Sequence, residues 1–269
     1  MTQAERDAAY NNTDAVPDSA ALTAARIAGS TAYRAAHPGH LDVPYQPGQR
    51  TKWDLFPATD PAAPCFVFIH GGYWQRGARE ENAVVAAGLA AHGWSVALPG
   101  YTLTPEASLA QIVDEIGAAL DWLQREGRAH GIAGPVLLSG WSAGAHLAAM
   151  ALSHPVARAG LAISGVFELG PIRDTYLNEK LRLTEDEIAT LSPLRLTPVA
   201  KPMSVAYGGD ELAALVNDGR ALHAHRRHAD PVGEDLNLSR LNHFSIIGEL
   251  TKPDGALVQA ALRLRPHMA

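Results

Sequence analysis

Gly140-Trp141-Ser142-Ala143-Gly144 follows the apolar run Val136-Leu137-Leu138, and small residues continue after it. A strand that turns sharply into a helix can lift a serine hydroxyl above the end of a sheet. The residues two positions either side of that serine must then be small, so that strand and helix can approach each other. Glycine stands at both positions, and four alanines within residues 143–149 extend the small-residue run. The pattern predicts a nucleophile elbow with Ser142 at its apex and a helix over residues 143–152.

A second glycine motif, His70-Gly71-Gly72-Tyr73-Trp74, comes directly after the apolar run Phe66–Ile69. Glycine-rich backbone of this kind can direct N–H groups at an oxygen that becomes negative during acyl transfer. The N–H of Ala143, at the N-terminus of the expected helix, points to the same place. The absence of Gly-Lys-Ser/Thr after the glycines excludes a phosphate-binding loop. Two such motifs in this order, each after a buried-type strand, predict an α/β-hydrolase fold.

The rest of the chain alternates strand and helix patterns, which indicates a mostly parallel sheet with helices on both faces. We expect one domain over residues 1–269, with an N-terminal helical segment at 1–45 and a cap insertion at 171–202 above the carboxyl ends of the strands. Strands are expected at 51–56, 66–69, 95–98, 136–138, 161–164, 204–207 and 235–238. Helices are expected at 18–36, 82–92, 108–127 and 143–152.

A serine nucleophile needs a base and an acid that orients the base, and in this fold the chain order is serine, acid, histidine. Gly208-Gly209-Asp210-Glu211 follows an expected strand, which makes Asp210 the predicted acid and Glu211 the alternative. Asp218 is a weaker alternative because it falls in the next expected helix. His243, after the last expected strand, is the predicted base.

Composition limits the function classes further. Hydrophobic residues make up 47% and charged residues 19% of the 269 residues, and the formal net charge is −6. No basic stripe, signal pattern or membrane-length apolar run is visible, so we expect a cytoplasmic enzyme with a small-molecule substrate and neither nucleic acid nor membrane as partner. A homodimer is left open. The only cysteine, Cys65, opens a strand and is expected in the core.

No cofactor and no metal is expected. The three histidines of residues 222–230 lie beside two arginines with no carboxylate opposite, which is typical of a solvated helix end rather than a zinc site. Aromatic side chains in loops that should surround the serine predict a pocket for a flat aryl group, although some of them could simply pack the core. The predicted pocket residues are Tyr73, Trp74, Trp141, Phe167, Tyr176 and Phe244; Tyr101 and Phe244 are as compatible with the core.

At this point the chain resembles the kynurenine formamidase (arylformamidase) branch of the α/β-hydrolases. The resemblance covers most of the chain, and its most specific element is the tyrosine-tryptophan pair after the glycines. It rests on Ile69-His70-Gly71-Gly72-Tyr73-Trp74-Gln75, on residues 140–147, on Ser164-Gly165-Val166-Phe167-Glu168-Leu169, on residues 208–211, on Asn242-His243-Phe244 and on Tyr10-Asn11-Asn12.

The resemblance implies hydrolysis of N-formylkynurenine to kynurenine and formate, with oxyanion donors at the backbone N–H groups of Gly72, Tyr73 and Ala143. One departure is Trp141, where family members frequently carry histidine, and this departure bears on the substrate more than on the chemistry. A carboxylesterase for short acyl esters would use the same residues. A binding protein that has lost catalysis would usually lack a triad member, whereas all three are present here.

Overall fold

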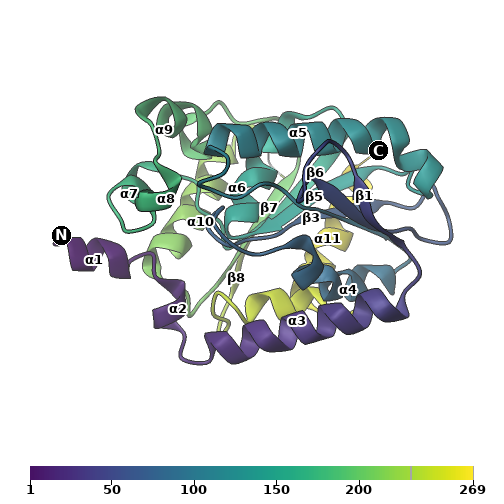
Figure 1. Ribbon diagram of the computed structural model, residues 1–269, viewed down its shortest axis with the longest axis horizontal. Helices are drawn as coiled ribbons and strands as arrows, with labels where there is room; N and C mark the ends of the chain where they lie inside the picture. The colour runs from purple at the N-terminus through teal and green to yellow at the C-terminus, as the bar shows by residue number, and fades with distance from the viewer. Residues whose placement is uncertain (231, 269) are drawn as a thin grey trace.

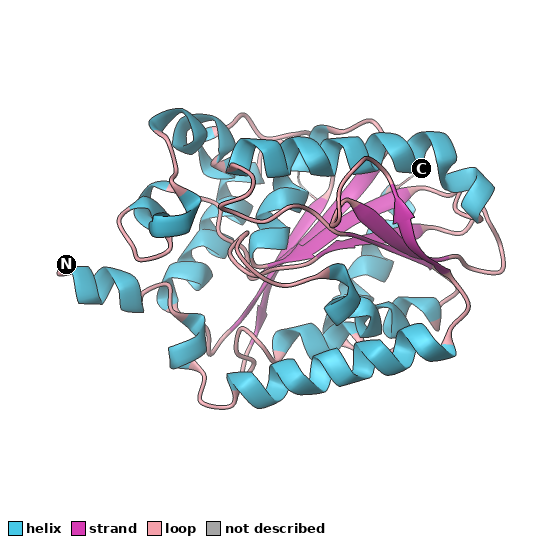
Figure 2. Ribbon diagram, viewed as in Figure 1, coloured by secondary structure: helices cyan, strands magenta, loops and turns pink. Residues whose placement is uncertain are grey.

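The computed structural model describes residues 1–230 and 232–268, and its centre is one sheet of eight strands (Figures 1 and 2). The strand order is β1-β2-β4-β3-β5-β6-β7-β8. The pairs β1/β2 and β2/β4 are antiparallel, and the remaining pairs are parallel. The strands are β1 (His40–Pro44), β2 (Lys52–Phe56), β3 (Cys65–Ile69), β4 (Ser95–Pro99), β5 (Val136–Trp141), β6 (Ala157–Ile163), β7 (Met203–Gly208) and β8 (Asp235–Leu238).

Helices cover both faces of the sheet, so the central strands are buried on both sides (Figure 2). The sequence Cys65-Phe66-Val67-Phe68-Ile69 of β3 is buried at every position, as a two-sided strand requires. One face packs on α5 and α6, and the other packs on α4 and α11. The helices are α1 (Gln3–Ala8), α2 (Asn12–Ala15), α3 (Ser19–Ala36), α4 (Ala86–Ala90), α5 (Leu109–Glu126), α6 (Ala143–Met150), α7 (Gly170–Arg173), α8 (Asn178–Leu181), α9 (Glu185–Leu191), α10 (Ala213–Arg226) and α11 (Ala256–Leu264).

The expected fold class is confirmed, and each expected strand is present with small shifts at its ends. The expected helix over 82–92 is instead a 3₁₀ segment, η1 (Arg79–Val85), followed by the short α4. The elements that were not predicted include the edge strand β1, the helices α7, α8 and α9 within the expected cap insertion, and the last helix α11. Cys65 lies in the core as expected, and burial raises the pKa of its thiol to about 12.

The N-terminal helices are part of the fold rather than an appendage. Helix α3 runs along η1, and its Arg26 donates hydrogen bonds from Nη1 to the Glu81 carbonyl oxygen (2.8 Å) and to Asn82 Oδ1 (2.6 Å). Residues 171–202 form α7, α8, α9 and a 3₁₀ turn between β6 and β7, at the end of the molecule that α1 also occupies (Figure 1).

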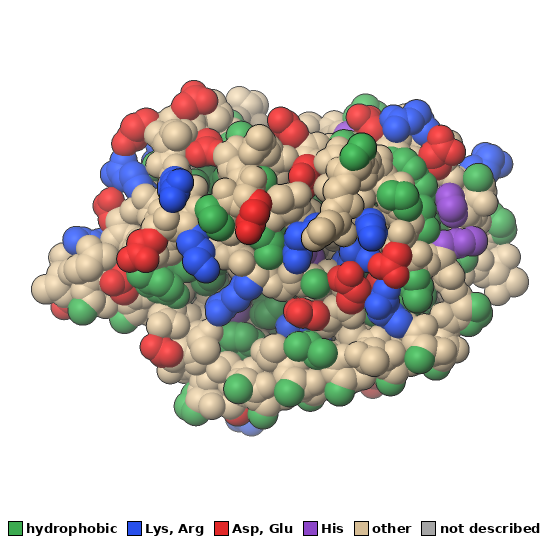
Figure 3. Space-filling model, viewed as in Figure 1, with side chains coloured by type: hydrophobic (Ala, Val, Ile, Leu, Met, Phe, Trp, Pro, Cys, Tyr) green, Lys and Arg blue, Asp and Glu red, His purple; other side chains and the backbone are tan. Residues whose placement is uncertain are grey.

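The viewed surface carries acidic and basic side chains in mixture, without a broad area of one sign (Figure 3). No helix in the described part of the chain is both long and apolar enough to cross a membrane.

Candidate active site

Five loops meet where the parallel strands end, because the carboxyl ends of parallel strands share one edge of the sheet. The loop after β3 carries the glycine motif, the turn after β5 carries Ser142, and the residue directly after β6 is Ser164. The turn after β7 carries Glu211, and the loop after β8 carries His243. This edge therefore gathers a hydroxyl, an imidazole and a carboxylate from distant parts of the sequence.

Ser142 has the strained backbone that a nucleophile elbow requires, with φ 57° and ψ −121°. Its own N–H donates to the Ile163 carbonyl oxygen (2.8 Å), which fixes the turn to the neighbouring strand β6. A Cβ on Gly144 would overlap the carbonyl oxygen of Ile69, so only glycine lets α6 start this close to β3. The sequence prediction of an elbow is confirmed by this geometry.

The glycine motif forms a second strained turn beside the serine. Gly72, Tyr73 and Trp74 all have positive φ, at 118°, 50° and 57°. The N–H groups of Gly72 and Tyr73 donate to no protein group within the residues that the structure describes. As the first residue of α6, Ala143 likewise has an N–H without an intrahelical acceptor. Three backbone donors thus remain free at the expected place.

Side chains behind this loop hold it in place. Arg50 donates to the carbonyl oxygens of Tyr101 (Nε, 2.9 Å) and Gly77 (Nη2). The His70 ring stacks on Tyr101 at 4.2 Å between centroids, and its Nδ1 lies 2.8 Å from the Gly71 carbonyl oxygen. Burial lowers the pKa of His70 to about 3, so the ring is neutral and suited to bracing the loop rather than to exchanging protons.

The partner of His243 is Glu211, and the prediction of Asp210 is wrong. His243 Nδ1 lies 3.0 Å from Glu211 Oε2, and both side chains are buried. The other oxygen of Glu211 accepts from the Gly208 N–H (2.6 Å) and from the Ser164 hydroxyl. Asp210 is exposed at the tip of the turn. Both residues follow the same strand, and only the turn geometry decides which one points inward.

Two further side chains fix the surroundings of this pair. The weaker alternative, Asp218, contacts neither triad partner; its Oδ2 accepts from the N–H groups of Phe167 (2.7 Å) and Glu168 (3.2 Å). Trp141 Nε1 donates to the His243 carbonyl oxygen (2.9 Å), and the two rings lie 5.1 Å apart. The residue that departs from the family pattern therefore holds the histidine loop in place.

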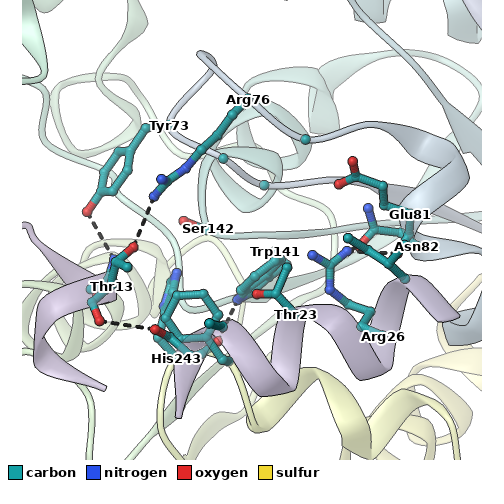
Figure 4. Close-up of a pocket in the computed structure, with 18 of the residues that line it drawn as sticks. Thr13, Thr23, Arg26, Tyr73, Arg76, Glu81, Asn82, Trp141, Ser142 and His243 are labelled. Atoms are coloured by element: carbon teal, nitrogen blue, oxygen red, sulfur yellow. Dashed lines mark hydrogen bonds between the residues drawn. The ribbon is translucent and has the colours of Figure 1, made fainter. Parts of the chain in front are cut away.

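A cavity of about 440 Å³ opens over Ser142 and His243 (Figure 4). Its outer wall comes from the N-terminal segment, with Asn12, Thr13, Thr23 and Arg26 facing the glycine motif. Residues 171–202 were expected to form a cap above the serine. Among the described residues, however, none from 171–202 lines this cavity. The sequence prediction missed this wall because α3 reads as an ordinary amphipathic helix.

Three of the six predicted pocket aromatics line the cavity, namely Tyr73, Trp141 and Phe244. The other three do not. Trp74 is fully buried and packs edge-on against His146 at 5.0 Å, Phe167 is buried in the core cluster beside β7, and Tyr176 is an exposed residue near α1. Tyr101 is also buried, with its hydroxyl donating to the His70 carbonyl oxygen (2.9 Å). Proximity in sequence to a catalytic motif does not decide which way a ring points.

Comparison with known proteins shows which families and folds this chain is similar to. The BD-FAE family model matches residues 55–158. A kynurenine formamidase from Salmo salar is 30% identical over 246 residues, which cover 83% of this chain and 81% of the relative, and one from Danio rerio is 29% identical over 242 residues with the same coverage. A candidate thioesterase from Silicibacter sp. TM1040 is 30% identical and superposes with a TM-score of 0.84, covering 94% of this chain and 97% of that one. The metagenomic carboxylesterase EstE1, at 18% identity, has a TM-score of 0.73 and covers 93% of this chain and 98% of its own.

The fold and the site define an α/β-hydrolase, and the chain is a hydrolase of this class. The sequence identity to the Salmo salar relative and the share of both chains that it covers identify the family within this class. The chain belongs to the kynurenine formamidase family.

Proposed function

We propose that this protein is a serine hydrolase that cleaves a small aryl formamide, with N-formylkynurenine as the leading substrate. The observation that carries the proposal is the arrangement of Ser142 at a strained elbow, with His243 lining the same cavity and the buried Glu211 bound to its ring. The kynurenine formamidases among the relatives support the choice of substrate class.

The proposed reaction has two steps. The Ser142 hydroxyl oxygen attacks the formyl carbon while His243 Nε2 takes the hydroxyl proton, and Glu211 stabilises the imidazolium. The free N–H groups of Gly72, Tyr73 and Ala143 bind the oxyanion. The C–N bond then breaks, the aryl amine leaves with the proton from His243, and a formyl ester remains on the serine. Water, deprotonated by His243, attacks that ester and releases formate.

A short-chain carboxylesterase remains the second candidate because the same residues would cleave an ester. Solved esterases share this fold. The two functions differ in the leaving group, so kcat/KM for N-formylkynurenine and for p-nitrophenyl acetate should be measured side by side. A formamidase should favour the formamide, and Ser142→Ala should lower kcat on both substrates by about 10⁴-fold.

Two outcomes of these measurements would contradict the proposed function. If Ser142→Ala keeps more than about a tenth of the wild-type kcat, the serine mechanism is wrong, since triad serines contribute far more than this. Efficient hydrolysis of octanoyl esters with no turnover of N-formylkynurenine would support the esterase instead.

A further inference from the structure

The cavity over Ser142 also contains charged side chains that lack ion-pair partners among the described residues, and two of them, a guanidinium and a carboxylate, are partly buried. Arg26 and Glu81 both line it, and both are half-buried. Neither has an oppositely charged group within 4.0 Å in the described part of the chain. A partly desolvated charge without a counter-charge is costly, and a ligand that supplies the counter-charge recovers that cost.

Hydrogen bonds to neighbouring groups fix the orientation of the Arg26 guanidinium. Its Nη1 donates to the Glu81 carbonyl oxygen and to Asn82 Oδ1, and Asn82 is in turn fixed by donating to the Ala78 carbonyl oxygen (2.8 Å). The guanidinium carbon lies 5.4 Å from the centre of the Trp141 ring. Burial lowers the pKa of Arg26, and the nearby Glu81 carboxylate partly offsets that effect. The remaining guanidinium donors have no protein acceptor among the described residues.

The charged pair lies within reach of the reacting atoms. The Trp141 ring has the imidazole of His243 5.1 Å away and the Arg26 guanidinium 5.4 Å away. In Figure 4 the Arg26 head lies between Trp141 and Asn82, with Glu81 above it and Ser142 on the other side of Trp141. A ligand that spans the indole can therefore place one end at the serine and the other at the charged pair.

We propose that Arg26 and Glu81 form a subsite for an α-amino acid group on the leaving portion of the substrate. The planar guanidinium takes the carboxylate, and the Glu81 carboxylate takes the ammonium. The proposal rests on the proposed function and deepens it, because it assigns two side chains to the zwitterionic amino acid group that N-formylkynurenine carries.

Arg76 is the competing cation in the same cavity, and it provides a matched control. It is exposed, and the one hydrogen bond of its side chain within the described residues is a long contact from Nη2 to Thr13 Oγ1 (3.4 Å). A solvated arginine contributes little to an ionic contact, since water screens the charge and the side chain loses entropy on binding. The geometry thus assigns the carboxylate to Arg26 and not to Arg76.

The test uses three formamides that share an aryl ring: N-formylkynurenine, its analogue without the amino group, and neutral 2-formamidoacetophenone. With Arg26→Met, kcat/KM should fall about 10- to 100-fold for the two carboxylates, mainly through KM, as expected for a lost charge-assisted contact. Glu81→Gln should lower kcat/KM about tenfold for N-formylkynurenine alone. Neither variant should alter kcat/KM for the neutral substrate. Arg76→Met should change kcat/KM by less than about threefold for all three substrates.

Two results overturn the subsite. An equal loss on all three substrates would mean that Arg26 only anchors α3, and a selective loss with Arg76→Met would move the carboxylate to the other arginine. If the wild type cleaves none of the formamides, the proposed function fails, and the subsite is then tested with O-acetyltyrosine against neutral p-cresyl acetate. Arg26→Met must lower the ratio of their kcat/KM values about tenfold or more, and an unchanged ratio refutes the subsite.

Discussion

Two buried histidines should make this fold lose stability in mild acid. His70 is the first residue of the glycine motif, and His146 lies in the first turn of α6, directly after the elbow. Burial lowers their pKa values to about 3 and about 4. One nitrogen of each ring faces a backbone carbonyl oxygen, of Gly71 (2.8 Å) and Leu191 (2.7 Å), and the other nitrogen is buried without a partner among the described residues.

The sign follows from proton binding. Each histidine has a lower pKa in the folded state than the ordinary value of about 6.5, so the unfolded chain binds more protons as the pH falls. The stabilisation is complete above about pH 6.5 and declines below it, by about 1.4 kcal/mol for each histidine between pH 7.5 and 5.5. Asp218 has the opposite effect, because burial raises its pKa to about 6 and the folded state therefore binds its proton first as the pH falls. This increases the unfolding free energy by about 0.8 kcal/mol between pH 7.5 and 5.5. The net loss in unfolding free energy from these three groups is therefore about 2 kcal/mol, and the lowered pKa of His130 acts in the same direction.

Urea unfolding followed by tryptophan fluorescence and by circular dichroism at pH 7.5 and 5.5 measures this difference. Few ordinary carboxyl groups titrate in that interval, which isolates the histidines. His146→Gln keeps an N–H donor for the Leu191 carbonyl oxygen and should reduce the pH dependence by about 1.4 kcal/mol, whatever it does to absolute stability. The exposed His228→Gln is the control and should leave the dependence as it is. Equal stability at the two pH values, or an unchanged difference in His146→Gln, would refute the reasoning.

Four substitutions test the site and its surroundings. Glu211→Gln should lower kcat by about 10³- to 10⁴-fold while Asp210→Asn stays within about twofold, and the reverse order would restore the aspartate as the acid. Gly71→Ala should lower kcat about 100-fold in a folded protein, because the added Cβ would lie 2.7 Å from the Trp141 carbonyl oxygen and 3.0 Å from the serine Cβ; wild-type turnover would contradict this. Trp74→Ala should cost about 3–5 kcal/mol of stability, measured by urea unfolding, without selectively weakening aryl substrates, and a selective rise in KM for aryl substrates would return this ring to the pocket.

The sequence was sufficient for the fold and for two members of the site because those features are local. The elbow around Ser142 needs small residues at fixed spacing, and a two-sided strand such as β3 needs a continuous apolar run, so both leave a readable pattern. His243 follows from strand order alone. Strand β1 was missed although it alternates polar and apolar residues, because it is a short, largely exposed edge strand that ends at a proline.

The choice between Asp210 and Glu211 depended on contacts that no local pattern encodes. Glu211 is selected by the N–H of Gly208 and the hydroxyl of Ser164, and Ser164 comes from a different strand. Its positive φ of 52° directly after β6 is the structural feature that accompanies this contact. A serine at the end of the strand beside the nucleophile strand is the signal that could have indicated a partner for the acid.

The cavity wall could not be predicted for a related reason, since it is built by contacts between segments far apart in the sequence. Tyr73 illustrates this, because its hydroxyl donates to the Tyr10 carbonyl oxygen (2.8 Å) and accepts from Asn12 Nδ2 (3.1 Å). The residue whose backbone N–H faces the proposed oxyanion is therefore tied by its side chain to the N-terminal segment.

Residues 171–202 support that segment from outside instead of covering the serine. The Tyr176 N–H donates to Asp7 Oδ1 (2.8 Å), Gln3 Nε2 donates to the Asp174 carbonyl oxygen (2.9 Å), and Gln75 Nε2 donates to the Leu177 carbonyl oxygen (2.8 Å). Residues 171–202 thus contact both the N-terminal helices and the loop after β3, which carries the glycine motif. Since the N-terminal segment forms the cavity wall and the loop after β3 carries the free N–H donors, the proposed reaction would use one packed unit both to bind the substrate and to stabilise the oxyanion.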